Sequence, residues 1–206
     1  MPLPDIILIR HGQTHWNREG RIQGHGDSTL TPLGEAQARA YGRLLANRFG
    51  PLEPYALYRS PAGRCQQTTR LLAGEAGLAF ADFAEDERLK EKGYGRWEGL
   101  TRPEIALLGE QSELAAMDAD PWGHKPPAGG ESLEEVMARA AQWLASLNPA
   151  RPVIAVAHGG TGRTLIRAAL GLAAEEALAI QMRQDVIFRI ARGNLDILET
   201  APDFAG

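Results

Sequence analysis

Two short apolar runs, each ending in a histidine, constrain the fold more than any other feature of this sequence. The run DIILI (5–9) is followed by Arg10 and His11, and the run VIAVA (153–157) is followed by His158. Branched apolar runs without polar alternation are typical of strands that are covered on both faces of a parallel sheet. Because ligands bind beyond the carboxyl ends of such strands, we expect both imidazoles to share one rim of the sheet.

Helical patterns lie between these runs. Thr31 and Pro32 have the order of an N-cap and a first helical residue, and apolar residues then recur at helical spacing until residue 50. Ser132 and Glu135 form a capping-box pattern that opens a second helix, which ends at Asn148. With YALY (55–58) as a weaker third strand, this alternation predicts an α/β three-layer sandwich. Its central sheet is mostly parallel, with helices on both faces.

The end of the chain predicts an antiparallel edge to this sheet. DVIFRIA (185–191) and LDILET (195–200) flank the turn sequence RGN, which is typical of a hairpin. We expect a single domain over residues 1–206, in which 92–130 is a long irregular region rich in glycine and proline. A loop of that length predicts a substrate-covering role.

Composition narrows the classes of function. The formal net charge of −4 provides no overall basic field for nucleic acid or an anionic membrane surface. The single cysteine, Cys65, excludes an internal disulfide, and no long apolar segment suggests export or membrane insertion. We therefore expect a cytoplasmic protein with no nucleic-acid or membrane partner, whose anionic ligands bind locally.

Several longer motifs identify a family resemblance. They are RHGQTHWNREGRIQGHGDSTLTPLGEAQA (10–38), RSPAGRCQQTT (59–69), LKEKGYGRWEGL (89–100), GGES (129–132) and VAHGG (156–160). Together they resemble the histidine phosphatase superfamily, which includes the cofactor-dependent phosphoglycerate mutases and many small phosphomonoesterases. The resemblance covers most of the chain.

The resemblance implies a set of site residues. His11 would be the nucleophile that forms a phosphohistidine, since a neutral imidazole nitrogen attacks phosphorus without first losing a proton. Arg10 and Arg64 would clamp the phosphate, His158 would donate a further hydrogen bond, and Glu91 would be the general acid. The implied substrate- and phosphate-binding residues are Asn17, Gln23, Gly24 and Gly159. By spacing alone, Glu85, Glu87 and Glu98 rival Glu91.

The same resemblance implies that no metal and no cofactor are needed. His11 and His15, four residues apart, could suggest a metal pair, but Gly12 and the strand end argue against a helix there. We expect 2,3-bisphosphoglycerate as a cofactor only if the protein is a mutase.

The spacing after Glu91 favours one branch of the family. Only 39 positions separate Glu91 from Gly130, which resembles the compact phosphatases, whereas mutases carry a longer insertion. We therefore predict a phosphomonoesterase that acts on small phosphorylated metabolites. The alternatives are a phosphoglycerate mutase, a non-catalytic phosphate-ligand binding protein, and a protein or phosphohistidine phosphatase. The C-terminal hairpin offers an edge for a homodimer.

Overall fold

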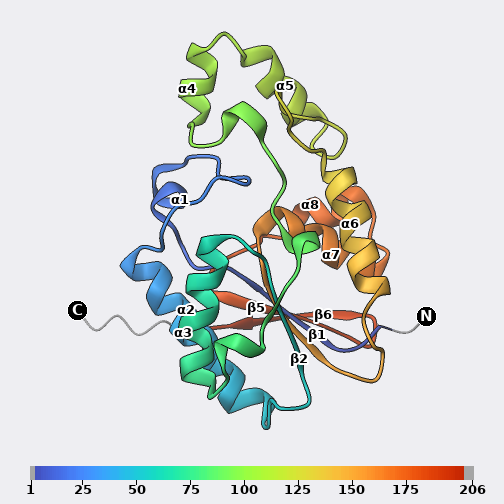
Figure 1. Cartoon of the computed structure of the whole chain (residues 1–206). Coiled ribbons are helices and arrows are strands. Elements are labelled where there is room, and N and C mark those ends of the chain that lie inside the picture. The colour runs from blue at the N-terminus through green and yellow to red at the C-terminus, as the bar shows by residue number, and fades with distance from the viewer. Residues whose placement is uncertain (1–2, 202–206) are drawn as a thin grey trace.

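The computed structural model describes residues 3–201 and arranges them around one six-stranded sheet (Figure 1). The strands are β1 (Ile6–Arg10), β2 (Ala56–Arg59), β3 (Ala84–Glu85), β4 (Val153–Ala157), β5 (Val186–Ala191) and β6 (Asn194–Glu199). The α-helices are α1 (His15–Glu19), α2 (Pro32–Phe49), α3 (Gly63–Ala76), α4 (Arg102–Leu107), α5 (Gln111–Ala119), α6 (Leu133–Ala145), α7 (Gly159–Leu170) and α8 (Ala174–Ala179). Three 3₁₀ turns cover Phe80–Asp82, Glu87–Leu89 and Gly95–Trp97.

The sheet has the order β3-β2-β4-β1-β5-β6. Strands β3, β2, β4 and β1 are parallel, while β5 runs antiparallel to β1 and β6 antiparallel to β5. The α/β class, the mostly parallel sheet and the antiparallel edge are therefore confirmed. In the register of β1 and β4, Arg10 lies opposite Ala157, so the two histidines that follow them leave the sheet side by side.

Helices cover both faces of the sheet (Figure 1). Ile7 and Ile9 pack with buried residues of α2 and α3, while Ile6 and Leu8 pack with buried residues of α6 and α7. Each of these side chains is almost fully buried and stabilises the fold by about 1.5–3 kcal/mol. The run is apolar at consecutive positions because both faces of the strand lie in the core.

The expected helix starts are confirmed by their capping bonds. Thr31 accepts a hydrogen bond from the Gly34 amide at the start of α2. Ser132 and Glu135 form the reciprocal capping box at the start of α6. These bonds satisfy amides that have no partner inside the helix, which is why the sequence signal is reliable.

The prediction of an irregular region at 92–130 is wrong over its middle part, which contains α4 and α5. Thr101 caps α4 through a capping box with Glu104, a signal present in the sequence TRPE. Trp97 is fully buried in a small separate core with Ile105 and Leu114. This part of the chain forms the upper region of the molecule, away from the sheet (Figure 1), and its role in covering substrate stays a prediction.

Within residues 3–201, no helix is both long and apolar enough to cross a membrane.

Candidate active site

A small pocket of about 140 Å³ lies at the carboxyl end of β1. Most of the residues expected in the site line it, although they come from distant parts of the chain. The lining residues are Arg10, His11, Asn17, Ile22, Gln23, Gly24, Arg64, Glu91 and Tyr94. The volume suits a phosphoryl-sized group, so the remainder of any larger ligand must extend outside it.

His11 has a defined tautomer in this pocket. Its Nδ1 lies 2.8 Å from the carbonyl oxygen of Gly12, which can only accept, so Nδ1 carries the proton. The other nitrogen, Nε2, keeps its lone pair and accepts a hydrogen bond from Arg64 Nε at 3.3 Å. Burial, reinforced by Arg64 and Arg10, holds the pKa of His11 well below its ordinary value. His11 is therefore a neutral imidazole with an available lone pair.

Glycine at two positions lets the loop after β1 pack against the start of α2. A Cβ atom on Gly12 would lie 2.2 Å from the carbonyl oxygen of Gly34, and one on Gly34 would lie 2.0 Å from that of Gln13. The Gly12 amide also donates to Thr68 Oγ1 of α3 at 3.1 Å. These contacts hold His11 against both helices, and any side chain at Gly12 would displace it.

The Arg64 guanidinium is nearly fully buried and held at several points. Nη1 donates to the Gly26 carbonyl at 2.8 Å and to Asp27 at 3.0 Å, while Nη2 donates to the Gly24 carbonyl at 2.8 Å. The N–H groups that remain for a ligand form one edge of the guanidinium, made of the Nε hydrogen and the second hydrogen of Nη2. In this structure the Nε hydrogen is donated to His11 Nε2. That edge can still form two parallel bonds to a phosphate.

Two buried polar atoms of the pocket residues have no partner among the described residues. They are Arg10 Nε and Gln23 Oε1. Buried polar atoms normally have partners, so these two suggest that a ligand completes the site. Gln23 Nε2 bonds Thr14 Oγ1, which already accepts from the Asn17 amide. A half-turn of the Gln23 amide would let it accept the Thr14 hydroxyl proton and present its NH₂ group instead, as an anion requires.

His158 lies beside His11 without lining this pocket. The two rings are 5.3 Å apart at an angle of 65°. His158 Nε2 is 2.7 Å from the Ser60 hydroxyl, and burial holds the pKa of His158 well below its ordinary value. Cys65 lies against the same ring, and burial raises the pKa of its thiol to about 12, so it is not a nucleophile.

Glu91 lies in the pocket wall with its carboxylate against the start of α7. Oε1 accepts from the backbone amides of Lys92 at 2.9 Å and Thr161 at 3.0 Å, and Oε2 accepts from that of Gly160 at 3.0 Å. Arg139 supports the same stretch by donating to the Glu91 carbonyl at 2.9 Å.

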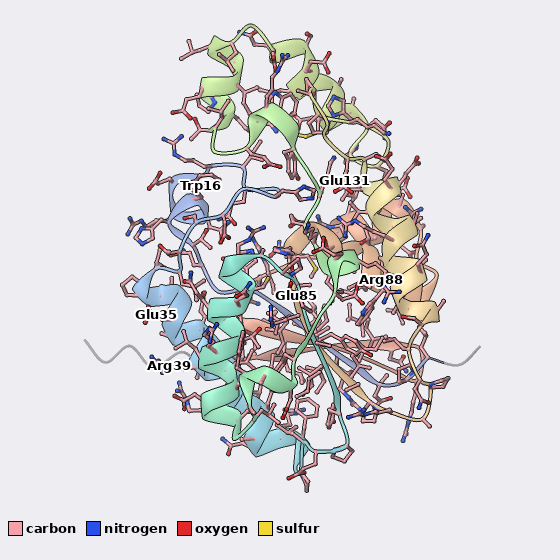
Figure 2. The ribbon with its side chains drawn as sticks, viewed as in Figure 1. Trp16, Glu35, Arg39, Glu85, Arg88 and Glu131 are labelled. Atoms are coloured by element: carbon pink, nitrogen blue, oxygen red, sulfur yellow. The ribbon has the colours of Figure 1, made fainter. Side chains whose placement is uncertain are left out.

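The rival carboxylates lie elsewhere. Glu85 pairs with Arg59 at the sheet edge, and Glu87 pairs with Lys90. Glu98 accepts from the amides of residues 25, 26 and 94, so it shapes the loop next to the pocket. Figure 2 shows Glu85 and Arg88 near the sheet and Glu131 higher up, on the segment that leads from α5 into α6.

The remaining expected residues have different positions. Asn17 and Gly24 line the pocket, and Gly24 has a left-handed backbone with φ of 56°. Gly159 contacts the Arg10 guanidinium, with a Cβ position 3.5 Å from Arg10 Nε, but it is not part of the pocket wall.

The aromatic residues of segment 92–130, which could line the pocket or pack in a core, have different positions. Tyr94 lines the pocket, whereas Trp97 and Trp122 lie in satellite cores. His124 stacks on the Trp97 ring at 5.9 Å.

Sequence reasoning missed two residues of the site. Arg163 of α7 lies close enough to affect Arg10 electrostatically, and Gln184 contacts both His11 and Asn17. Gln184 lies in the connection between α8 and β5, where no motif indicates it. Arg163 follows VAHGGT by two residues, and its spacing from His158 was the available signal. Among the residues described, no group of three or more His, Cys, Asp or Glu side chains is arranged to hold a metal ion.

Fold and site together define an α/β protein with a buried neutral histidine facing an arginine-lined anion pocket. The model of the histidine phosphatase superfamily (branch 1) matches residues 6–195, and the chain belongs to this family. The chain is 34% identical over 178 residues to glucosyl-3-phosphoglycerate phosphatase of Mycobacterium tuberculosis, covering 81% of this chain and 75% of the relative. It is 32% identical over 197 residues to the 2,3-bisphosphoglycerate-dependent phosphoglycerate mutase of Brucella ovis, covering 90% and 91%.

Solved structures give the same result. Mycobacterial glucosyl-3-phosphoglycerate phosphatase in complex with VO3 superposes with a TM-score of 0.78 at 30% identity, covering 96% of this chain and all of that chain. The α-ribazole phosphatase from Shigella flexneri superposes with a TM-score of 0.77 at 25% identity, covering 97% and 96%. The resemblance inferred from the motifs is therefore confirmed.

Proposed function

We propose that the protein is a phosphomonoesterase that hydrolyses small phosphorylated metabolites through a phosphohistidine on His11. The observation that carries the proposal is the His11 ring itself: Nδ1 is held by the Gly12 carbonyl, and the Nε2 lone pair faces the pocket beside Arg64. Relatives found by sequence and by structure include proteins named as phosphatases, which supports a phosphomonoesterase.

The reaction divides into two transfers. His11 Nε2 attacks phosphorus, the bond to the leaving oxygen breaks, and Glu91 gives that oxygen a proton. Water then attacks phosphorus, the bond from phosphorus to His11 Nε2 breaks, Glu91 takes the proton of the water, and inorganic phosphate leaves. Arg10 and Arg64 stabilise the charge on the equatorial oxygens, which is the main contribution a protein makes to phosphoryl transfer.

The positive charge for this chemistry comes from side chains. Arg10 and Arg64 line the pocket and Arg163 lies nearby, so the proposal requires neither a metal nor a cofactor. We further propose a cytoplasmic protein of a single domain, with a small phosphorylated substrate as its ligand. A homodimer through the β6 edge stays a prediction.

A phosphoglycerate mutase is the second candidate function. The Brucella ovis mutase is matched over 91% of its own length, so overall length does not separate the two activities. The short connection from Glu91 to Gly130 supports hydrolysis, because a mutase must keep water from the phosphohistidine while its substrate reorients.

One experiment tests both candidates. The protein is incubated with 3-phosphoglycerate, with and without 2,3-bisphosphoglycerate, and in parallel with a panel of phosphorylated metabolites including glucosyl-3-phosphoglycerate. Inorganic phosphate and 2-phosphoglycerate are both measured. Release of phosphate from at least one monoester, with little 2-phosphoglycerate formed, is the expected result. Isomerisation that exceeds hydrolysis would establish the mutase. Absence of both products, together with calorimetric binding of inorganic phosphate, would establish a phosphate-ligand binding protein.

A further inference from the structure

Side chains from three other elements donate hydrogen bonds to the backbone of the connection between α8 and β5 and hold it next to the site. Arg10 Nη1 of β1 donates to the Met182 carbonyl at 2.5 Å. Arg163 of α7 donates to the Ile180 carbonyl at 3.2 Å, and the Tyr41 hydroxyl of α2 donates to the Gln184 carbonyl at 2.5 Å. The backbone that carries Gln184 is therefore fixed close to the nucleophile.

The Gln184 side chain bridges the nucleophile and a pocket residue. Its Nε2 donates to the His11 carbonyl at 3.1 Å and to Asn17 Oδ1 at 2.9 Å. The first bond fixes the Gln184 amide, because a backbone carbonyl can only accept. Gln184 therefore donates a hydrogen bond to Asn17, and Asn17 accepts it with its Oδ1 oxygen.

A second donor places the same restriction on Asn17. The Thr14 backbone amide donates to Asn17 Oδ1 at 3.2 Å, in the capping box that opens α1. With two N–H groups on its oxygen, the Asn17 amide has only its NH₂ group left for a ligand. Because Asn17 lines the pocket and phosphoryl oxygens only accept hydrogen bonds, this is the one amide orientation that stabilises a bound phosphoryl group.

We propose that Gln184 is a positioning residue that holds the Asn17 amide with its NH₂ group toward the transferring phosphoryl group. The proposal rests on the proposed function and adds a residue that none of the family motifs contains. Gln184 acts on the phosphoryl group through Asn17, so most of the effect of removing it should depend on the presence of Asn17, and only the part due to its bond with the His11 carbonyl should not.

Two substitutions of Gln184 separate orientation from packing. Gln184→Leu removes the donor and leaves the Thr14 amide as the sole restraint, so phosphorylation should slow about 3- to 10-fold, the value of one ordinary hydrogen bond. In Gln184→Glu, the side chain at position 184 presents only acceptors to Asn17. The Asn17 NH₂ group should then turn toward residue 184 and away from the pocket. The Asn17 oxygen then faces the phosphoryl group, and the loss should reach about 10²-fold.

The test is a double-mutant cycle with Asn17→Ala, with single-turnover phosphorylation by p-nitrophenyl phosphate and calorimetric binding of inorganic phosphate as readouts. In the Asn17→Ala background, Gln184→Leu should have a much smaller effect than in the parent, limited to its lost bond with the His11 carbonyl. The additional loss in Gln184→Glu should fall to the effect of the added negative charge. Arg183→Gln is the matched control, since this exposed neighbour pairs with Asp185 and Glu199 on the surface and should keep parental rates. Thermal unfolding identifies any variant that is not folded.

The outcomes are distinct. Losses that multiply independently of Asn17, or a Gln184→Glu variant no worse than Gln184→Leu, would overturn the positioning role while leaving the phosphatase intact. A parent protein without turnover would refute the proposed function. The double-mutant cycle measured by phosphate binding would still show whether Gln184 and Asn17 are coupled. A parent that neither turns over nor binds phosphate would overturn both.

Discussion

Glu91 and Thr161 meet at the first turn of α7, where Glu91 Oε1 accepts the Thr161 backbone amide at 3.0 Å. The other oxygen accepts the Gly160 amide, so the Glu91 carboxylate occupies the place that an anion takes at a helix N-terminus. The helix that follows His158 thus orients Glu91 as well, and the nucleophile and the proposed acid depend on neighbouring strands of one sheet.

The proposed role of Glu91 as the general acid predicts that its replacement affects two kinds of substrate differently. In Glu91→Gln, phosphorylation by an alkyl phosphate should slow by about 10²–10⁴-fold, because its leaving alkoxide needs a proton. Phosphorylation by p-nitrophenyl phosphate should slow much less, because phenolate leaves without one. Single-turnover phosphorylation is the measurement, because Glu91 also activates water in the second step. Equal losses for both substrates would argue against protonation of the leaving group.

The same substitution carries a structural cost that must be measured separately. Both oxygens of Glu91 accept backbone amides, so the NH₂ group of glutamine must face a donor. We expect the free energy of unfolding to fall by about 1–3 kcal/mol, as for other unsatisfied buried groups. Glu87→Gln, at an exposed position, is the control and should leave both stability and rates unchanged.

Replacing His11 with alanine should abolish the phosphoenzyme. The parent, quenched during turnover of labelled substrate, should carry phosphate that is labile in acid and stable in base, as expected for phosphohistidine. His11→Ala should carry none and should keep its far-ultraviolet circular dichroism spectrum, because the strand itself ends at Arg10. A phosphoenzyme that persists without His11 would move the nucleophile elsewhere.

Arg64→Lys should lower kcat/KM by at least about 10²-fold although the charge is unchanged. Arg64 bonds the carbonyls of Gly24 and Gly26 while keeping one edge for a ligand, and a single ammonium cannot do both. Arg70→Lys is the matched control, since Arg70 lies on the same helix, stacks on the Phe80 ring and is not among the residues that line the pocket. Near-parental activity of Arg64→Lys would place that residue outside the phosphate clamp.

The pH dependence of stability follows from the two buried histidines. The pKa values of His11 and His158 are both held well below 6.5 in the folded state, first by burial and then by Arg64. As pH falls below about 6.5, the unfolded chain takes up protons that the folded chain does not, so stability is lost with acidification. For each histidine the slope should approach about 1.4 kcal/mol per pH unit once the pH lies well below 6.5 but still above the folded-state pKa. Denaturant unfolding at several pH values measures the slope of stability against pH, and His11→Asn should reduce that slope by the contribution of one histidine.

Activity should survive chelation. The pocket gathers its positive charge from arginine side chains, so EDTA should leave hydrolysis of p-nitrophenyl phosphate unchanged within error. Inactivation that one divalent ion reverses would show that a metal takes part in the reaction.

The sequence predicts best those features that depend on local patterns. The covered strands and the caps at Thr31 and Ser132 follow from apolar runs and short-range hydrogen bonding, and the hairpin follows from its turn sequence. Arg10, His11 and Arg64 meet at one pocket because their motifs are a strand end and a helix start at the same rim. Glu91 reaches the pocket from the irregular segment after the 3₁₀ turn Glu87–Leu89, and only the family resemblance singled it out.

The parts that sequence reasoning missed depend on tertiary contacts. The Gln184 amide has no role until β5 pairs with β1, and no local pattern distinguishes it from a surface glutamine. The glycines and prolines on both sides of residues 102–119 predict an irregular segment, although the sequence TRPE contains the capping box that starts α4 at Thr101. The Arg64 bonds to the Gly24 and Gly26 carbonyls likewise exist only after two segments 40 residues apart have met.

The bond from Arg10 to Met182 also has a consequence during protein synthesis. The two residues are 172 positions apart, and His11 and Gln184 are 173 apart. At about 5–20 residues per second, the ribosome delivers the second partner roughly ten to thirty seconds after the first. Throughout that interval the nascent chain carries the complete RHG motif while the arginine and the Asn17 amide lack the groups that orient them. Chains released before residue 184 also lack β5, which pairs with β1 and contributes buried side chains to both faces of the sheet, so they should not fold into an active protein.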